Sequence, residues 1–241
     1  MLRGQEKRVR DAEGEMSWKK LAVCWVMAAA VTTAGCEAFP FKQQEVRYQE
    51  VGIIRLKDRM VPAEVKLVKG VPARLHIIDG TGAEGEKLTI SGLNMEVGVT
   101  PGTAASVTLA PKEVAKLDGQ ALSGAPGRGM VRFRVVGNEK NLMTEAMGGR
   151  AEVAVVLTGQ LAAPKRVVLT RGVPVVMYVA MSESETGFDN FGCDALGLTT
   201  RVQDREVKEV EWRPESVGTY VFTGTVTPDS QVSVVVVEAG R

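Results

Sequence analysis

The chain has 241 residues, with 30 Lys and Arg against 29 Asp and Glu, one His and three Cys. Hydrophobic residues make up 44% and the net charge is near zero, so the composition is that of a packed globular protein rather than a disordered one. The lack of a basic excess argues against nucleic acid as a partner, and a single His excludes a His-rich metal centre.

The N-terminal part has the features of a secretory signal. Lys19 and Lys20 precede an apolar run over 21–33, which is shorter than the roughly 20 residues that a membrane-spanning helix needs. Small residues end the run, as at a signal cleavage site. Residues 1–35 are therefore predicted to be a signal segment. Because 1–15 has mixed charge and no apolar pattern, one interpretation is that it is an upstream mis-start and that Met16 is the true start.

The end of this segment, Thr33-Ala-Gly-Cys36, resembles the lipobox of bacterial lipoproteins, although Thr33 stands where Leu is usual. The resemblance implies that Cys36 is lipidated and begins the mature chain, with 36–44 as a linker. An ordinary cleaved signal or a single membrane anchor is the alternative. With Cys24 in the signal and Cys36 carrying lipid, Cys193 has no partner for a disulfide and is interpreted as a small apolar residue.

The remaining chain is predicted to be all-β. Runs rich in β-branched residues, several alternating apolar with polar, are typical of strands that place one face on a core; they lie at 65–68, 105–109, 131–136 and 232–237. Turn residues recur about every 8–12 positions, which favours a sandwich or barrel. The one helix we expect is short and lies over 111–117.

An internal repeat divides this β-rich part. Residues 62–72 align without gaps on 164–174, at an offset of 102. Three further residues, Val107, Pro111 and Val114, match Val210, Pro214 and Val217 at an offset of 103. We align 129–133 with 218–222 by treating 118–128 as an inserted loop. A repeat of about 100 residues has the size of a domain, so the prediction is two domains, 45–158 and 159–241, joined near 159–164.

The second copy resembles the cupredoxin fold. It has a strand, Arg-Gly-Val-Pro and a second strand over 167–179, then Pro214 at a corner, Gly218-Thr-Tyr-Val-Phe222 and a last strand at 231–237. The first copy follows the same order. The resemblance implies two tandem Greek-key β-sandwiches, and an immunoglobulin-like sandwich is the competing assignment.

The resemblance also implies where a type 1 copper site would lie. That site needs two imidazoles, a thiolate and a weak axial ligand such as Met. The family's Cys follows Tyr-x-Phe closely, but 223–226 and 134–137 contain no Cys, and neither 86–90 nor 187–191 contains the upstream His. Cys193 lies on a different connection. We therefore expect no type 1 copper and no other cofactor.

Few other residues suggest a metal-binding or catalytic role. His76 aligns with Tyr178, which indicates a structural role. The weak metal candidates are Met143, Met147 and Met95, whose thioethers could bind Cu(I), although Met more often fills gaps in a core. The oxygen-rich segment 182–194 lacks the spacing of a calcium loop and is interpreted as a solvated connection. No nucleophile elbow, phosphate loop, zinc motif or acid–base pair is present, so the chain is not expected to be an enzyme.

These features together predict an extracytoplasmic lipoprotein, periplasmic or on the cell surface, that is held to the membrane by its lipid. Its two copper-free domains would act as a binding or scaffolding module for an envelope protein, through loops and sheet edges. The alternative is a protein that handles copper or another metal through methionine ligands.

Overall fold

The computed structural model describes residues 47–81, 86–110, 121–123, 129–138, 142–144, 146–226 and 229–239. They belong to one compact unit, Val46–Arg241. The predicted signal segment, the lipidation site Cys36, the linker to residue 44 and the short helix expected at 111–117 lie outside the described residues. Within the described ranges, the secondary structure is β apart from one turn of 3-10 helix, η2 (Asp194–Leu196), and no helix is long and apolar enough to cross a membrane.

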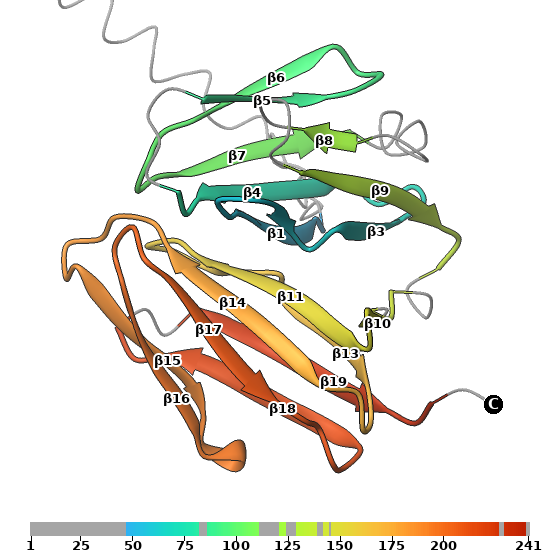
Figure 1. Ribbon diagram of the computed structural model, residues 1–241, viewed down its shortest axis with the longest axis vertical. Helices are drawn as coiled ribbons and strands as arrows, with labels where there is room; N and C mark the ends of the chain where they lie inside the picture. The colour runs from blue at the N-terminus through green and yellow to red at the C-terminus, as the bar shows by residue number, and fades with distance from the viewer. Residues whose placement is uncertain are drawn as a thin grey trace, which may run out of the picture. The chain divides into compact units, whose positions relative to one another are not determined.

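Two sheets form the first β-sandwich (Figure 1). One has the order β2 (Met60–Val61), β1 (Gln49–Arg55), β4 (Ala73–Asp79), β7 (Ala104–Leu109). The other has the order β3 (Glu64–Val68), β9 (Met130–Val136), β8 (Ala121–Ser123), β5 (Glu86–Ile90), β6 (Met95–Val99). The pairs β1–β4 and β3–β9 are parallel, and the other pairs are antiparallel.

The second β-sandwich repeats this topology, with β12 as the counterpart of β2 and with one additional strand, β10. One sheet has the order β10 (Ala146–Met147), β11 (Arg150–Leu157), β14 (Val175–Met181), β17 (Val207–Trp212), with β12 (Ala162–Ala163) also paired to β11. The other has the order β13 (Arg166–Thr170), β19 (Gln231–Val237), β18 (Gly218–Gly224), β15 (Phe188–Cys193), β16 (Leu198–Gln203). Again the parallel pairs are the equivalent ones, β11–β14 and β13–β19. The prediction of an all-β chain with two Greek-key, cupredoxin-like sandwiches is confirmed.

The 102-residue offset extends to the strand register. Gln49 pairs with Ala73 in the first copy, and Ala151 pairs with Val175 in the second. The register also corrects one alignment. Residues 129–133, which we matched to 218–222, belong mainly to β9, and β9 is the counterpart of β19 because it pairs in parallel with β3 as β19 does with β13. The counterpart of β18 is β8, which lies inside the segment predicted to be an inserted loop.

The joint between the sandwiches lies earlier than 159–164. Strand β11 was expected to end the first domain, but it lies in the sheet of β14 and β17. The chain therefore passes from one sandwich to the other between β9 and β10. Residues 142–144 and 146–149, which the prediction assigned to the first domain, lead into the second sandwich instead. The offset of 102 places β1 (Gln49–Arg55) on β11 (Arg150–Leu157), and the pairing of β11 with β14 agrees with that equivalence.

Each sandwich has its own core, and a third apolar cluster joins them. Strand β14 explains how: every residue of Val175–Met181 is buried. Val175, Met177, Val179 and Met181 face the core of the second sandwich, while the intervening residues belong to the joining cluster. A strand buried on both faces is expected to be continuously apolar. The buried members of the joining cluster are Ile54, Val61, Ile78, Ala154, Val156, Val176, Tyr178 and Ala180.

Candidate binding cleft

In the second sandwich, a hydrogen-bonded carboxylate connects the two segments, 187–191 and 223–226, in which the cupredoxin resemblance implies copper ligands. Asp189 on β15 is buried, and its Oδ1 accepts hydrogen bonds from the backbone N–H groups of Thr225 (2.8 Å) and Val226 (3.0 Å), and from Thr225 Oγ1 (3.4 Å). A Cβ at Gly224 would overlap this carboxylate, so the glycine allows the close approach. The remaining cavity, beside Met181 and Phe188, measures about 10 Å³, roughly enough for one water molecule.

These residues do not fit a copper ion. Asp189 offers oxygen where copper would need imidazole and thiolate, and Cys193 is buried in the core of the second sandwich. No group of three or more His, Cys, Asp or Glu able to hold a metal occurs in the described part of the chain. Most of the corresponding loops of the first sandwich, 82–85 and 124–128, lie outside that part. The segment 182–194, interpreted as a solvated connection, in fact contributes strand β15 and its buried Asp189.

Removing the Asp189 carboxylate should cost considerable stability. In Asp189→Ala, the backbone N–H groups of Thr225 and Val226 lose a charged acceptor whose own side chain is buried, and we expect the free energy of unfolding to fall by about 1–3 kcal/mol. Asp189→Asn is the matched control, because its carbonyl oxygen can still accept, and it should cost less than about half as much. Chemical denaturation of both variants measures the difference, and equal losses would show that the hydrogen bonds contribute little.

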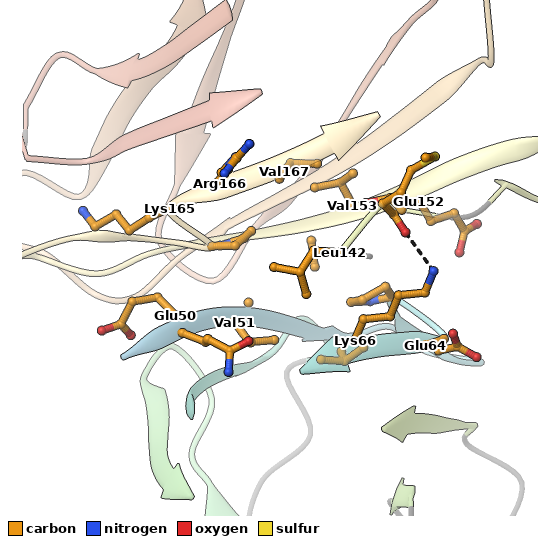
Figure 2. A pocket seen from close by; sticks show the side chains of 18 of the residues that line it. Glu50, Val51, Glu64, Lys66, Leu142, Glu152, Val153, Lys165, Arg166 and Val167 are labelled. Atoms are coloured by element: carbon orange, nitrogen blue, oxygen red, sulfur yellow. Dashed lines mark hydrogen bonds between the residues drawn. The ribbon is translucent and has the colours of Figure 1, made fainter. Parts of the chain in front are cut away.

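A cleft of about 590 Å³ lies between the sandwiches (Figure 2). Its walls come from equivalent positions of the two copies, each pair separated by the 102-residue offset. The pairs are Glu50 and Glu152, Val51 and Val153, Gly52 and Ala154, Pro62 and Pro164, Ala63 and Lys165, Glu64 and Arg166, and Val65 and Val167. Matching surfaces that meet in this way are typical of an isologous contact. The cleft is therefore a product of the duplication.

Glycine allows the two sandwiches to approach closely beside the cleft. A Cβ at Gly52 would overlap the carbonyl oxygen of Ala163 and lie 2.8 Å from that of Ala154. At another point of contact, the amide of Glu183 in the second sandwich donates to the carbonyl of Gly102 in the first at 2.6 Å. Within the second sandwich, Arg205 Nε donates to Glu183 Oε1 at 2.7 Å. Backbone atoms of the two sandwiches thus lie in direct contact at two points beside the cleft.

The two equivalent glutamates of the cleft are held by different partners. Glu152 accepts a hydrogen bond from Arg59 Nη1 at 2.8 Å, and Arg59 Nη2 also donates to the Tyr178 hydroxyl at 2.6 Å. Burial acts to lower the pKa of Arg59, but the hydrogen bond and charge of Glu152 outweigh it, so the pKa is raised. Burial raises the pKa of Tyr178 despite the nearby Arg59 cation. The phenol therefore stays neutral, and Arg59 and Glu152 form an ion pair that links the sandwiches.

Glu50 is held within the first sandwich. Its carboxylate lies 2.6 Å from His76 Nε2 and 3.3 Å from Arg74 Nη1, and Ser106 Oγ lies 3.1 Å from His76 Nδ1. His76 is buried, and the register confirms that it occupies the place of Tyr178, opposite Gly52 as Tyr178 is opposite Ala154. The imidazole therefore positions Glu50 at the wall of the cleft, in keeping with the structural role expected of it.

A short segment of the chain lies in the cleft as an added strand. Met143 forms an isolated parallel bridge with Val168 on the edge strand β13, and the Thr144 amide donates to the Val168 carbonyl at 2.9 Å. From the opposite wall, Lys66 Nζ donates to the Met143 carbonyl at 3.0 Å (dashed line in Figure 2). The side chain of Leu142 lies between the strands of the two sandwiches in the same view.

The structure separates two of the three candidate metal ligands, Met95 and Met143. Met143 Sδ accepts a hydrogen bond from Thr170 Oγ1 at 3.1 Å on the second sandwich. Met95 begins β6 and packs against the core of the first sandwich, at the sheet edge opposite to β3. Strand β3, whose Lys66 contacts Met143, lies at the other edge of that sheet, four strand spacings of about 4.8 Å from β6. Met147 is part of β10, but its side chain lies outside the described residues. The structure does not bring Met95 and Met143 together.

Sequence patterns did not reveal the cleft. Its charged residues are scattered over β1, β3, β11, β13 and the residues before β1 and β13, and no motif connects them; they are Arg47, Glu50, Glu64, Lys66, Glu152, Lys165 and Arg166. The available signal was the repeat itself, because it places Glu50 and Glu152 at equivalent positions. Only the docking of the two sandwiches showed that both face one cavity.

Comparisons with known proteins identify no family for this chain. No protein-family model and no curated protein matches the chain. One similar solved structure is the Cu(I)-bound metal-binding domain of the Cu(I)-exporting P-type ATPase CopA of Streptococcus pneumoniae D39, at 16% identity and a TM-score of 0.37, covering 40% of this chain and 94% of that one.

Two further solved structures have similarly low sequence identities and TM-scores. The copper-containing nitrite reductase NirK of Thermus scotoductus SA-01 has 13% identity and a TM-score of 0.30, covering 79% of this chain and 68% of that one. Auracyanin A, a blue copper protein of Chloroflexus aurantiacus, has 12% identity and a TM-score of 0.30, covering 36% and 100%. Copper is a property of those proteins, and the cupredoxin-like assignment of this chain comes from its strand order.

Proposed function

We propose that this chain is an extracytoplasmic lipoprotein, anchored through Cys36, whose two copper-free sandwiches form a binding module of the cell envelope. The cleft between the sandwiches is its binding site. The supporting observation is the cleft itself: a preformed concavity of about 590 Å³, within the range of about 300–1,000 Å³ that ligand sites occupy. Its wall combines apolar side chains with a few charged ones, which is the composition of a recognition site.

A pair of tryptophan variants tests this proposal. Ala63 lines the cleft, and Ala63→Trp should fill part of it. Val221 is exposed on β18, and it does not line the cleft, so Val221→Trp adds the same side chain elsewhere. Envelope proteins cross-linked to the membrane-bound chain should be lost in Ala63→Trp, by at least about tenfold, as a difference of about 1.4 kcal/mol in affinity implies. They should be retained in Val221→Trp. Equal capture by both variants would remove the cleft from the proposal.

The anchor is tested separately in cells. Metabolic labelling with a lipid analogue should modify the chain, and Cys36→Ser should abolish the label and release the protein from membranes. Labelling that persists in Cys36→Ser would refute lipidation at this residue.

Metal handling is the alternative function, and its one structural support is the half-buried thioether of Met143 on the edge of β13. Metal analysis after challenge with Cu(I) and Cu(II) separates the two functions. We expect the chain from Glu37 onward to retain less than stoichiometric copper, because one thioether is a poor site. One copper per chain, lost in Met143→Ala with Met147→Ala, would favour metal handling instead.

A further inference from the structure

The segment Leu142–Thr144 shows how the cleft takes a polypeptide. Its backbone extends the sheet of β13, with Thr144 N–H bonded to the Val168 carbonyl and Met143 bridged to Val168. Strand β13 is the edge of its sheet, so this segment covers part of an edge that would otherwise be open to another chain. Lys66 reaches across from the first sandwich and donates to the Met143 carbonyl.

The contacts of this segment are mostly to its backbone. The Thr144 amide and the Met143 carbonyl are main-chain groups, which any extended peptide supplies. Specificity comes from the position of Leu142, whose side chain lies in the cleft (Figure 2). Main-chain hydrogen bonds for affinity and a pocket for alternate side chains are the marks of recognition by strand addition.

The charges around this edge favour an acidic peptide. Lys165 and Arg166 are exposed at the start of β13, and Lys66 contributes a third cation from the other wall, which also carries Glu64. The other two glutamates of the cleft, Glu50 and Glu152, are paired with Arg74 and Arg59, so cations outnumber the remaining carboxylate at this edge. The chain's own sequence meets this preference, since Glu139 and Glu145 flank Leu142–Thr144. Opposite charges across an interface assist association and register.

We propose that the cleft binds an extended, acidic peptide segment of a partner protein as a strand on the edge of β13, and that Leu142–Thr144 competes with it for the same edge. This inference rests on the proposed role of the cleft as a binding site. The segment belongs to the same chain, so its effective concentration is on the order of millimolar. A partner peptide therefore has to displace it, which limits binding to partners that make further contacts in the cleft.

A matched pair of substitutions at Thr144 tests the competition. Thr144→Pro removes the N–H that bonds to Val168, whereas Thr144→Ala keeps it. The probe is a fluorescent synthetic peptide with the sequence of residues 138–146, added to the chain from Glu37 onward, which contains the whole compact unit. We expect Thr144→Pro to bind the peptide at least about tenfold more tightly than the wild-type protein or Thr144→Ala, because its own segment no longer competes.

Two results would overturn the inference: no binding of the peptide to Thr144→Pro, or equal binding to all three proteins. Thermal unfolding checks that Thr144→Pro is folded. Leu142→Ser, which removes the apolar side chain instead of the N–H and adds no charge, should bind the peptide as Thr144→Pro does. If Ala63→Trp abolishes capture of envelope proteins while the peptide fails to distinguish the Thr144 variants, the cleft remains the binding site and strand addition is rejected.

Discussion

Replacing Gly52 with valine is expected to separate the two sandwiches. The new side chain would overlap the carbonyl oxygen of Ala163 and come close to that of Ala154, and neither backbone atom can move away without displacing β12 or β11. Overpacking at a well-packed contact costs about 1–3 kcal/mol or more, and we expect a loss of about 3 kcal/mol in the free energy of unfolding. The wild-type chain should unfold in one transition because the apolar cluster joins the sandwiches, and Gly52→Val should unfold in two.

Gly98 provides the matched control for this variant. It also lies in a strand, β6, but a Cβ at that position meets no atom within 4 Å. Gly98→Val should therefore change the free energy of unfolding by less than about 0.5 kcal/mol. Calorimetry and limited proteolysis between β9 and β10 compare the two variants. A single transition with unchanged stability in Gly52→Val would show that the sandwiches tolerate a wider spacing.

The second large effect is expected at the buried ion pair of the first sandwich. Arg55 and Asp79 are both fully buried, with Nη1 and Oδ2 at 3.5 Å, and Asp79 also accepts hydrogen bonds from Thr81. Asp79→Ala removes the counter-charge of a buried guanidinium. Breaking a buried pair in this way costs about 3–5 kcal/mol, and we expect a loss of that size by urea denaturation. Removal of the exposed Glu96, which pairs with Lys87, should cost less than about 1 kcal/mol.

The second copy suggests which residues could restore the stability that Asp79→Ala loses. Leu157 and Met181 pair in the register that Arg55 and Asp79 occupy in the first copy. The double variant Arg55→Leu, Asp79→Met should recover most of the stability that Asp79→Ala loses, since apolar residues of similar size often replace a buried ion pair without loss. A double variant no more stable than Asp79→Ala would mean that the ion pair has no apolar substitute at this position.

Strand content and the repeat followed from sequence because both depend on local patterns. Alternation in 131–136 and the β-branched run 232–237 located strands that the structure contains. The ungapped match of 62–72 with 164–174 predicted that β3 and β13 are equivalent, and their parallel pairings agree. Strand β8 was missed because Ala-Leu-Ser has no β-branched residue and only three residues, so its pairing with β5 and β9, not its propensity, makes it a strand.

The buried Asp189 was missed for a similar reason. In sequence it lies in a polar stretch that predicts a solvated connection, and its acceptor role depends on Thr225 and Val226, more than 30 positions away. The same holds for Glu50, His76 and Ser106, which come from three strands. Long-range polar contacts of this kind have no signature in the spacing of neighbouring residues.

The sequence by itself determined the all-β class, the duplication and the cupredoxin-like strand order. It also determined that the segments expected to carry type 1 copper ligands contain neither Cys nor His. Only the tertiary structure decided how closely Gly52 lets the two copies approach, and that Glu50 and Glu152 face one cleft. The physical reason is that periodicity records which side of a strand is buried. It does not record which strand supplies the hydrogen-bond partners, or which second sheet covers a face that is apolar on both sides.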